Sequence, residues 1–110
     1  MILTPEHIEK IICREFSISS EQLKCKSRNK ELVFARHLMC YLIKKYSPHY
    51  SLKSIGTYLK RDHTSVIHAI KCINNYLDSK HPLQYTIVDI KLKVDDFRLR
   101  LVLGHYPNAY

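Results

Sequence analysis

Apolar residues recur every three or four positions along most of the chain, which is the spacing that gathers them on one face of an α-helix. The first such run follows Thr4 and Pro5, residues favoured at the start of a helix, and it predicts a helix to about Phe16. Ser19 or Ser20 can cap a short second helix. A third, longer run ends before Pro48 and predicts a helix carrying Leu32, Ala35, Met39, Leu42, Ile43 and Tyr46 on one face.

The middle of the chain predicts two helices joined by a tight turn. Ser51 can cap a short helix, and Asp62 can cap a longer one. Gly56 lies inside the short helix, where glycine costs about 1 kcal/mol relative to alanine, so we expect another helix's backbone to approach it closely. This arrangement is a helix-turn-helix candidate. The inward face of its longer helix is predicted to be Val66, Ile67, Ile70, Ile73 and Leu77.

The last apolar run has Ile87, Ile90, Val94, Phe97 and Leu101 at intervals of three and four. It predicts a C-terminal helix over about residues 82–103, although the alternation through residues 90–94 also suits a short strand. The stripe has two interpretations: a helix packed on its own domain, or the seam of a homodimer. Altogether the pattern predicts one compact all-α domain over residues 1–110, with about six helices.

Composition narrows the function classes. The 110 residues include only two glycines, Gly56 and Gly104, which excludes the glycine-rich loops that hold nucleotide phosphates. We find no signal peptide and no membrane span, so we expect a cytoplasmic protein without a membrane partner. The four cysteines contain no CxxC pair, and we expect them to be reduced and mostly buried. His37 and Cys40 would make only half of a metal site, so we predict no metal.

The positive charge is concentrated in one segment. Of the formal net charge of +8, residues 24–61 contribute ten lysines and arginines against the single acidic residue Glu31. A basic segment of this kind predicts a face that binds a polyanion. The alternative is a solvated basic surface that only keeps the protein soluble. Charge alone does not distinguish DNA from RNA.

Two stretches carry a more specific signal. Residues 51–56 (Ser-Leu-Lys-Ser-Ile-Gly) and 60–69 (Lys-Arg-Asp-His-Thr-Ser-Val-Ile-His-Ala) resemble the signature of the C-terminal DNA-binding domain, domain IV, of the bacterial replication initiator DnaA. Residues 26–33 and 35–42 resemble the basic loop and the long helix of the same domain. The similarity covers about residues 5–80, and it implies a helix-turn-helix fold of the Trp repressor type.

The resemblance also implies roles for individual residues. The helix from about His63 would enter the major groove, where Asp62, His63 and Thr64 read base edges. The basic loop, residues 24–30, would insert Arg28 into the minor groove, which suits an arginine. The residues expected to contact phosphates are Lys26, Lys44, Ser51, Lys53, Lys60, Arg61 and Ser65. From spacing alone, Asp62 could be only a helix cap and His63 only an exposed residue.

Two departures from the family pattern affect the prediction. The family usually has glycines before the Arg-Asp-His sequence, where this chain has Leu59 and Lys60 and a turn one residue shorter. The recognition helix is therefore expected at a slightly different angle. Ser65 replaces a more usual threonine, which keeps the hydroxyl and loses a methyl group.

The resulting hypothesis is a bacterial protein that binds double-stranded DNA at a DnaA-box-like site, in replication initiation or its regulation. We expect it to lack the initiator's ATPase, to use no cofactor, to perform no catalysis and to associate with the nucleoid. The alternative is a protein–protein interaction or dimerisation module that uses the stripe at residues 87–101, with weak or nonspecific DNA binding. The hypothesis requires that Thr64 be exposed and that Arg28 and Asp62 lie on the same side of the molecule.

Overall fold

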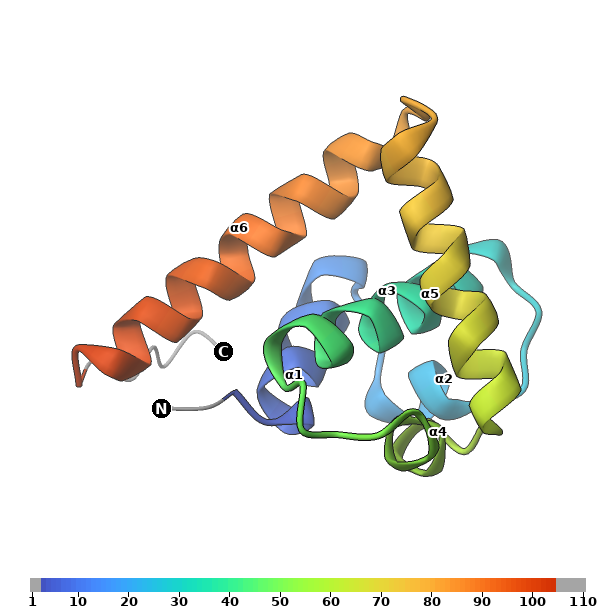
Figure 1. Cartoon of the computed structure of the whole chain (residues 1–110), viewed down its shortest axis with the longest axis horizontal. Coiled ribbons are helices and arrows are strands. Elements are labelled where there is room, and N and C mark those ends of the chain that lie inside the picture. The colour runs from blue at the N-terminus through green and yellow to red at the C-terminus, as the bar shows by residue number, and fades with distance from the viewer. Residues whose placement is uncertain (1–2, 105–110) are drawn as a thin grey trace.

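Six α-helices follow one another along the chain in the computed structural model, which describes residues 3–104 (Figure 1). No strand occurs within that range, so the stretch at residues 90–94 is helical and the strand alternative is wrong. The predicted all-α fold with a helix-turn-helix is confirmed. The helices are α1 (Pro5–Phe16), α2 (Ser20–Lys24), α3 (Lys30–Tyr46), α4 (Leu52–Leu59), α5 (His63–Asp78) and α6 (Leu83–Val102).

Local side-chain hydrogen bonds fix where the first helices begin. The Thr4 hydroxyl accepts from the backbone N–H of His7 at 3.4 Å, and the His7 ring accepts in return from the Thr4 N–H at 3.3 Å. Ser19 and Gln22 form the same reciprocal pair at the start of α2. These bonds satisfy N–H groups that have no partner inside the helix. The caps therefore start each helix at a residue that the sequence itself specifies.

The long helix α3 lies at the centre of the domain and packs against α1, α2, α4 and α5. Its inward side is buried from Ala35 to Tyr46, because apolar side chains on this face pack against those helices. The cysteines differ from the expectation, since Cys40 on α3 is buried but Cys13, Cys25 and Cys72 are only half-buried. The fully buried apolar residues of α3 are Ala35, Leu38, Met39, Leu42 and Ile43.

The predicted inward face of α5 is confirmed at Val66 and Ile73, which are buried, and at Ile70 and Leu77, which pack partly buried against the core, but not at Ile67. Ala69 is buried where α5 packs against α3 and α4, whereas Ile67 is 39% exposed. A small residue on the inner face lets two helix backbones approach closely, and the larger Ile67 is displaced towards solvent. The prediction that Ile67 faces inward is wrong, and Val66, Ala69 and Ile73 form the buried row.

Gly56 permits the tight connection between α4 and α5. A Cβ atom at this position would lie 2.4 Å from the carbonyl oxygen of Arg61 and 3.2 Å from the backbone of Asp62. The close approach was expected from another helix, but the approaching backbone is that of the turn itself. Any side chain here would push the turn away from α4.

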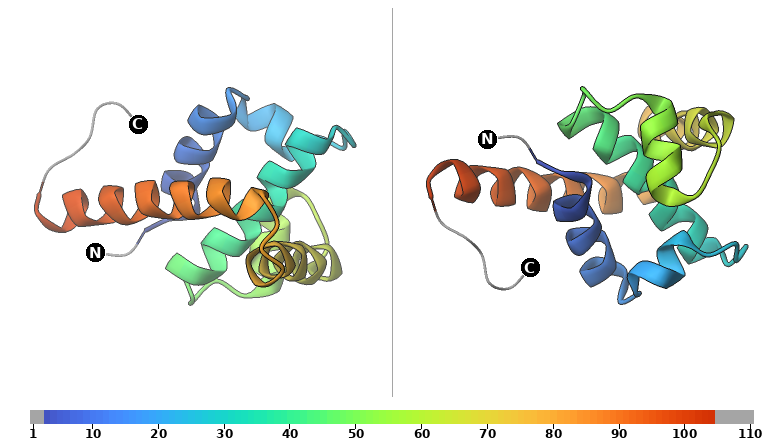
Figure 2. Two further views of the ribbon diagram at one scale, coloured as in Figure 1. Left: turned by 90° about the horizontal axis from the view of Figure 1, so that it is seen from above. Right: turned by 90° about the horizontal axis from the view of Figure 1, so that it is seen from below.

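The C-terminal helix α6 runs back across the domain from the end of α5 and packs against α5 and α1 (Figures 1 and 2). Its predicted stripe is buried, from 0% exposed at Ile87 and Val94 to 5% at Phe97 and Leu101. The Phe97 ring lies 5.2 Å from the His7 ring of α1, centroid to centroid. A stripe covered by its own domain cannot also be a dimer seam, so that interpretation of residues 87–101 is wrong. No helix within residues 3–104 is both long and apolar enough to cross a lipid bilayer.

A buried carboxylate ties α1 to α2 and α4. Glu9 is 9% exposed and accepts hydrogen bonds from the hydroxyl groups of Ser20 and Tyr58. Lys24 lies 3.6 Å from the same carboxylate. Burial by itself raises the pKa of Glu9, but the two hydroxyl donors and the Lys24 charge outweigh it and hold the pKa below the ordinary value. The ionised carboxylate therefore stabilises the folded state.

We predict that Gly56→Ala lowers the free energy of unfolding by about 2–3 kcal/mol, because the added methyl group meets backbone that cannot rotate away. Thr57→Ala, an exposed change one residue further along α4, should alter it by less than about 0.5 kcal/mol. Urea unfolding followed by circular dichroism measures both. If Gly56→Ala left the free energy of unfolding unchanged, that result would contradict the close packing of the turn on α4.

We predict that Glu9→Gln destabilises the domain at neutral pH by about 1–3 kcal/mol, since it replaces a charged acceptor in a buried network. A carboxylate with a lowered pKa contributes stability above the unfolded-state value, 4.5, and loses it as the pH falls through the folded-state value. The difference between wild type and variant should therefore shrink below about pH 4.5 in urea titrations. If the difference in free energy of unfolding between wild type and variant stayed constant down to about pH 3, that result would contradict a lowered pKa of Glu9 in the folded state.

Candidate nucleic-acid interface

The turn between α4 and α5 is set by backbone conformation. Lys60 ends α4 in the left-handed region, with φ of 59° and ψ of 43°. Its N–H donates to the carbonyl of Thr57 at 3.2 Å, and the N–H of Arg61 donates to the carbonyl of Gly56 at 2.7 Å. These bonds satisfy the last carbonyls of α4 and reverse the chain. Glycine adopts this left-handed conformation without the steric cost of a Cβ atom, and Lys60 adopts it here.

Asp62 begins α5, as predicted. Its carboxylate accepts from the backbone N–H of Ser65 at 2.8 Å. Hydrogen bonds from the Ser65 N–H and hydroxyl hold the pKa of Asp62 below its ordinary range, so it is ionised at neutral pH. Asp62, His63, Thr64 and Ser65 are all exposed. The N-terminal turn of α5 therefore presents exposed polar side chains at the positive end of a helix dipole.

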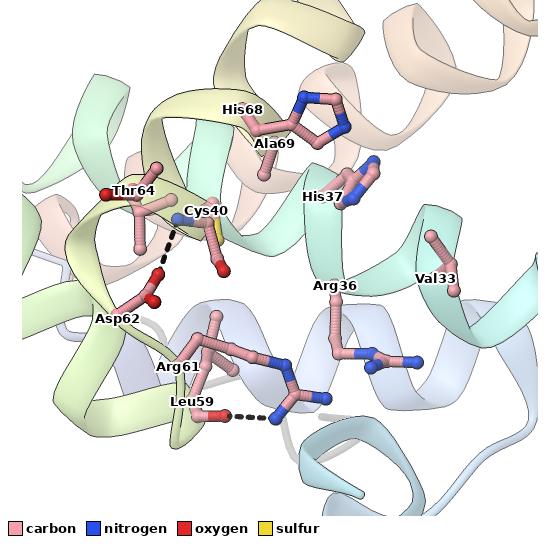
Figure 3. Close-up of a pocket in the computed structure, with 12 residues that line it drawn as sticks. Val33, Arg36, His37, Cys40, Leu59, Arg61, Asp62, Thr64, His68 and Ala69 are labelled. Carbon is pink, nitrogen blue, oxygen red and sulfur yellow. Dashed lines mark hydrogen bonds between the residues drawn. The ribbon is translucent and has the colours of Figure 1, made fainter. Parts of the chain in front are cut away.

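The basic loop, predicted at residues 24–30, spans residues 25–29 between α2 and α3, and two arginines hold it in place. Arg36 of α3 is only 8% exposed and donates to the carbonyl oxygens of Leu32 at 3.3 Å, Cys25 at 3.1 Å and Ser27. Arg61 of the turn donates to the same Cys25 carbonyl and to that of Lys24 at 3.4 Å. Figure 3 shows the two guanidinium groups extending from α3 and from the turn towards one region.

This arrangement, which we call the arginine clamp (Arg36, Arg61 and the Cys25 carbonyl), connects the loop directly to the helix-turn-helix. Burial, and then the charge of Arg61, lower the pKa of Arg36, but an arginine remains charged at any physiological pH. Two like charges are tolerated at this point because each guanidinium donates to several carbonyl oxygens. The clamp fixes where the loop leaves α2 and how it approaches the turn.

Sequence reasoning missed Arg36, whose donors all go to backbone carbonyls. One available signal was its place in the apolar stretch of α3, next to the inward-facing Ala35. Arg61, predicted as a phosphate contact, instead has most of its guanidinium directed at carbonyl oxygens of the loop and the turn. It is half-buried, while the predicted contacts Lys26, Arg28 and Lys60 around it are exposed.

The basic loop and the start of α5 line one hollow. Its volume is about 400 Å³, and its walls include Lys26 and Arg28 from the loop, Lys60 from the turn, and Asp62 and Ser65 from α5. Thr64 is exposed, and Arg28 and Asp62 lie on the same side of the molecule. Both geometric conditions set by the sequence hypothesis are therefore met.

A second groove of about 460 Å³ lies alongside, between α3, the turn and α5 (Figure 3). Arg61, Asp62 and Ser65 line both hollows, so the two are continuous at the start of α5. Across this groove the rings of His37 and His68 are 5.7 Å apart, centroid to centroid. Burial, and then the neighbouring His68, lower the pKa of His37. His37 is thus a half-buried packing residue of the groove wall.

The remaining predicted contacts gather at the other end of α4. Lys44 is exposed near the end of α3, and its Nζ donates to the carbonyl of Tyr50 at 3.4 Å, just ahead of Ser51 and Lys53. The Ser51 hydroxyl caps α4 by accepting from the Ser54 N–H at 3.0 Å. His63 is exposed on the first turn of α5 but lines neither hollow.

Comparison with known proteins places this architecture in a family. Residues 5–73 match the family described as the bacterial DnaA protein helix-turn-helix. The chain belongs to the bacterial DnaA helix-turn-helix family. It is an all-α domain of the DNA-binding type, and the matched residues extend from α1 into α5.

Relatives include chromosomal replication initiator proteins DnaA from several bacteria. The chain is 37% identical to the protein of Chlorobaculum tepidum over 94 residues, and this match covers 84% of this chain and 19% of that protein. It is 36% identical over 94 residues to that of Nautilia profundicola, covering 84% of this chain and 21% of the relative. The chain therefore spans about a fifth of the length of these DnaA proteins. In this DnaA-type domain, α6 lies beyond the family match.

We predict that Arg36→Met frees the basic loop without unfolding the domain. The Ser27 carbonyl loses its arginine donor, so the free energy of unfolding should fall by about 1–3 kcal/mol. Amide hydrogen exchange should accelerate in residues 25–29 more than elsewhere. Lys45→Met, which removes an exposed charge of the same helix, is the control. Equal exchange rates in the loop of both variants would contradict the clamp.

Proposed function

We propose that this domain binds double-stranded DNA sequence-specifically at a DnaA-box-like site. The observation that carries the proposal is that the start of α5 and the basic loop line one hollow while presenting different chemistry. The first offers short polar side chains at a helix N-terminus, and the second offers long cationic ones. To contact a major groove and the adjacent minor groove at once, a protein must present two such elements on the same face.

In this proposal the N-terminal turn of α5 enters the major groove. Thr64 is exposed, and its methyl group can pack on the methyl group of thymine. The ionised Asp62 carboxylate can accept from the exocyclic amine of cytosine or adenine while it caps the helix. His63 precedes Thr64 on the same exposed turn and is the third candidate for base contact.

The basic loop places Arg28 in the adjacent minor groove. Arg28 is exposed, while the backbone on its N-terminal side is fixed by the arginine clamp. A narrow minor groove over A·T base pairs has enhanced negative potential, which favours an inserted arginine. A loop that is ordered before binding loses less conformational entropy on binding.

Phosphate contacts then fix the register of the domain on the duplex. Lys26, Lys60 and Ser65 border the hollow between loop and helix. Lys44, Ser51 and Lys53 lie at the opposite end of α4, where they would contact the backbone further along. Arg61 contributes positive potential at the start of α5, while its guanidinium donates to the carbonyl oxygens of Cys25 in the loop and Lys60 in the turn. These contacts supply affinity and position without reading sequence.

The relatives are chromosomal replication initiators, which suggests a role in bacterial replication initiation or its regulation. We place that role at the nucleoid. In this proposal the domain's own part is to bind DNA without catalysing a reaction.

We predict that Arg28→Ala, Thr64→Ala and Asp62→Asn each weaken binding to a DnaA-box duplex by about 1–3 kcal/mol. Asparagine is chosen at position 62 because it still caps α5. Lys53→Ala should weaken binding to the box and to a scrambled duplex equally, because it contacts phosphate only. Fluorescence anisotropy at one fixed salt concentration measures both affinities.

The ratio of the affinities for the box duplex and for the scrambled duplex tests whether binding is sequence-specific. A wild-type domain that binds the box duplex and the scrambled duplex with equal affinity would show nonspecific binding and overturn the proposal. A salt dependence that is the same for wild type and Lys53→Ala would remove Lys53 from the phosphate contacts.

A further inference from the structure

The helix α6 carries a second apolar stripe, on the side turned away from the core. Its members are exposed: Tyr85 by 73%, Val88 by 45%, Leu92 by 61%, Leu99 by 55% and Val102 by 60%. At 3.6 residues per turn, this stripe lies roughly 150° around the helix from the buried one. Single exposed apolar residues are common, but a row of them along one helix face indicates an interaction surface.

The exposed stripe follows a heptad pattern. Tyr85, Leu92 and Leu99 take the a positions, and Val88 and Val102 take d positions. From this face we infer that α6 pairs in parallel with the α6 of a second copy of the chain. The pairing involves α6 alone and does not depend on DNA binding.

The charges beside the stripe select the partner and its direction. Asp89 and Asp96 flank it on one side, at e positions, and Lys91 and Arg98 flank it on the other, at g positions. In a parallel pair each g residue faces an e residue of the other copy, so Lys91 meets Asp96. In an antiparallel pair equivalent flanks meet, and aspartate would face aspartate. The pattern therefore favours a parallel pair of identical helices.

The flanking acidic groups remain available to a partner. Asp89 is bridged to Lys93 at 3.2 Å and Asp96 to Arg100 at 3.1 Å, yet their side chains are 60% and 52% exposed. A carboxylate can accept from more than one donor. On the other flank, the Lys91 ammonium lies 5.9 Å from the centroid of the Tyr41 ring, at the border between core and stripe.

One polar residue interrupts the stripe. Asp95 occupies the central d position, and its hydrogen bond with the Tyr46 hydroxyl directs its carboxylate towards α3. A polar residue in a seam reduces the stability of the pair. We therefore expect a weak dimer, with a Kd on the order of 100 μM.

The aspartates beside the stripe also disfavour DNA phosphates and anionic lipid as occupants of this face.

Sedimentation equilibrium of the full chain tests the pairing. Between about 10 μM and about 1 mM, the apparent mass of the wild type should rise from 13.0 kDa towards twice that value. Leu92→Glu, which places a charge in the seam at an exposed position, should raise the Kd at least about tenfold. Thr86→Glu adds the same charge on α6 outside the stripe and should associate like wild type.

Two results would overturn the pairing: a wild type that stays at 13.0 kDa over the whole range, or a Leu92→Glu variant that associates as strongly as wild type. Circular dichroism of each variant establishes that the helices are retained.

Cysteine cross-linking tests the direction. In a parallel pair Val88 faces its own counterpart, so oxidised Val88→Cys should form a disulfide-linked dimer that the wild type, with its native cysteines, does not form. In an antiparallel pair Val88 faces Leu99 instead. Cross-linking only when Val88→Cys and Leu99→Cys chains are mixed would overturn the parallel arrangement.

Discussion

The carbonyl oxygen of Cys25 accepts hydrogen bonds from two guanidinium groups, one on α3 and one in the turn before α5. Through this atom the basic loop, the central helix and the helix-turn-helix become one unit. Each guanidinium is charged, and each would be costly to place near the other without acceptors. The carbonyls of Lys24, Cys25 and Ser27 supply those acceptors. The loop carrying Arg28 therefore keeps a defined position relative to Thr64.

The same turn depends on two backbone conditions. Gly56 leaves the space that the Arg61 carbonyl occupies, and Lys60 takes the left-handed conformation that reverses the chain. Since Arg61 directly follows Lys60, the geometry that joins α4 to α5 also aims the guanidinium at the loop. The tight turn and the close packing on Gly56 are thus parts of one arrangement. Binding would use a rigid surface in which only the exposed side chains adjust.

Structural features that depend on residues close in the sequence could be predicted, and contacts between distant parts of the chain could not. The caps at Thr4, Ser51 and Asp62 depend on residues three positions away, so sequence alone located these helix starts, and it restricted the cap of α2 to Ser19 or Ser20. One position on the inward face of α5, Ile67, was misjudged because burial of Ala69 instead depends on how closely α3 packs. The apolar stripe at residues 87–101 predicted the C-terminal helix but not what the helix packs against. Periodicity does not say which surface covers a stripe. The family motif indicated candidate site residues, most of which are exposed, but the position of Arg36 depends on carbonyls of a distant loop.

The most direct test of this account is selection of bound duplexes from a random pool, performed with the wild type and with Arg36→Met. If the clamp positions the loop, the wild type should recover a conserved block read in the major groove, with an adjoining A·T-rich block read in the minor groove. Arg36→Met should recover the first block and lose the second. The same two-part consensus from both proteins, or no consensus from either, would contradict the account.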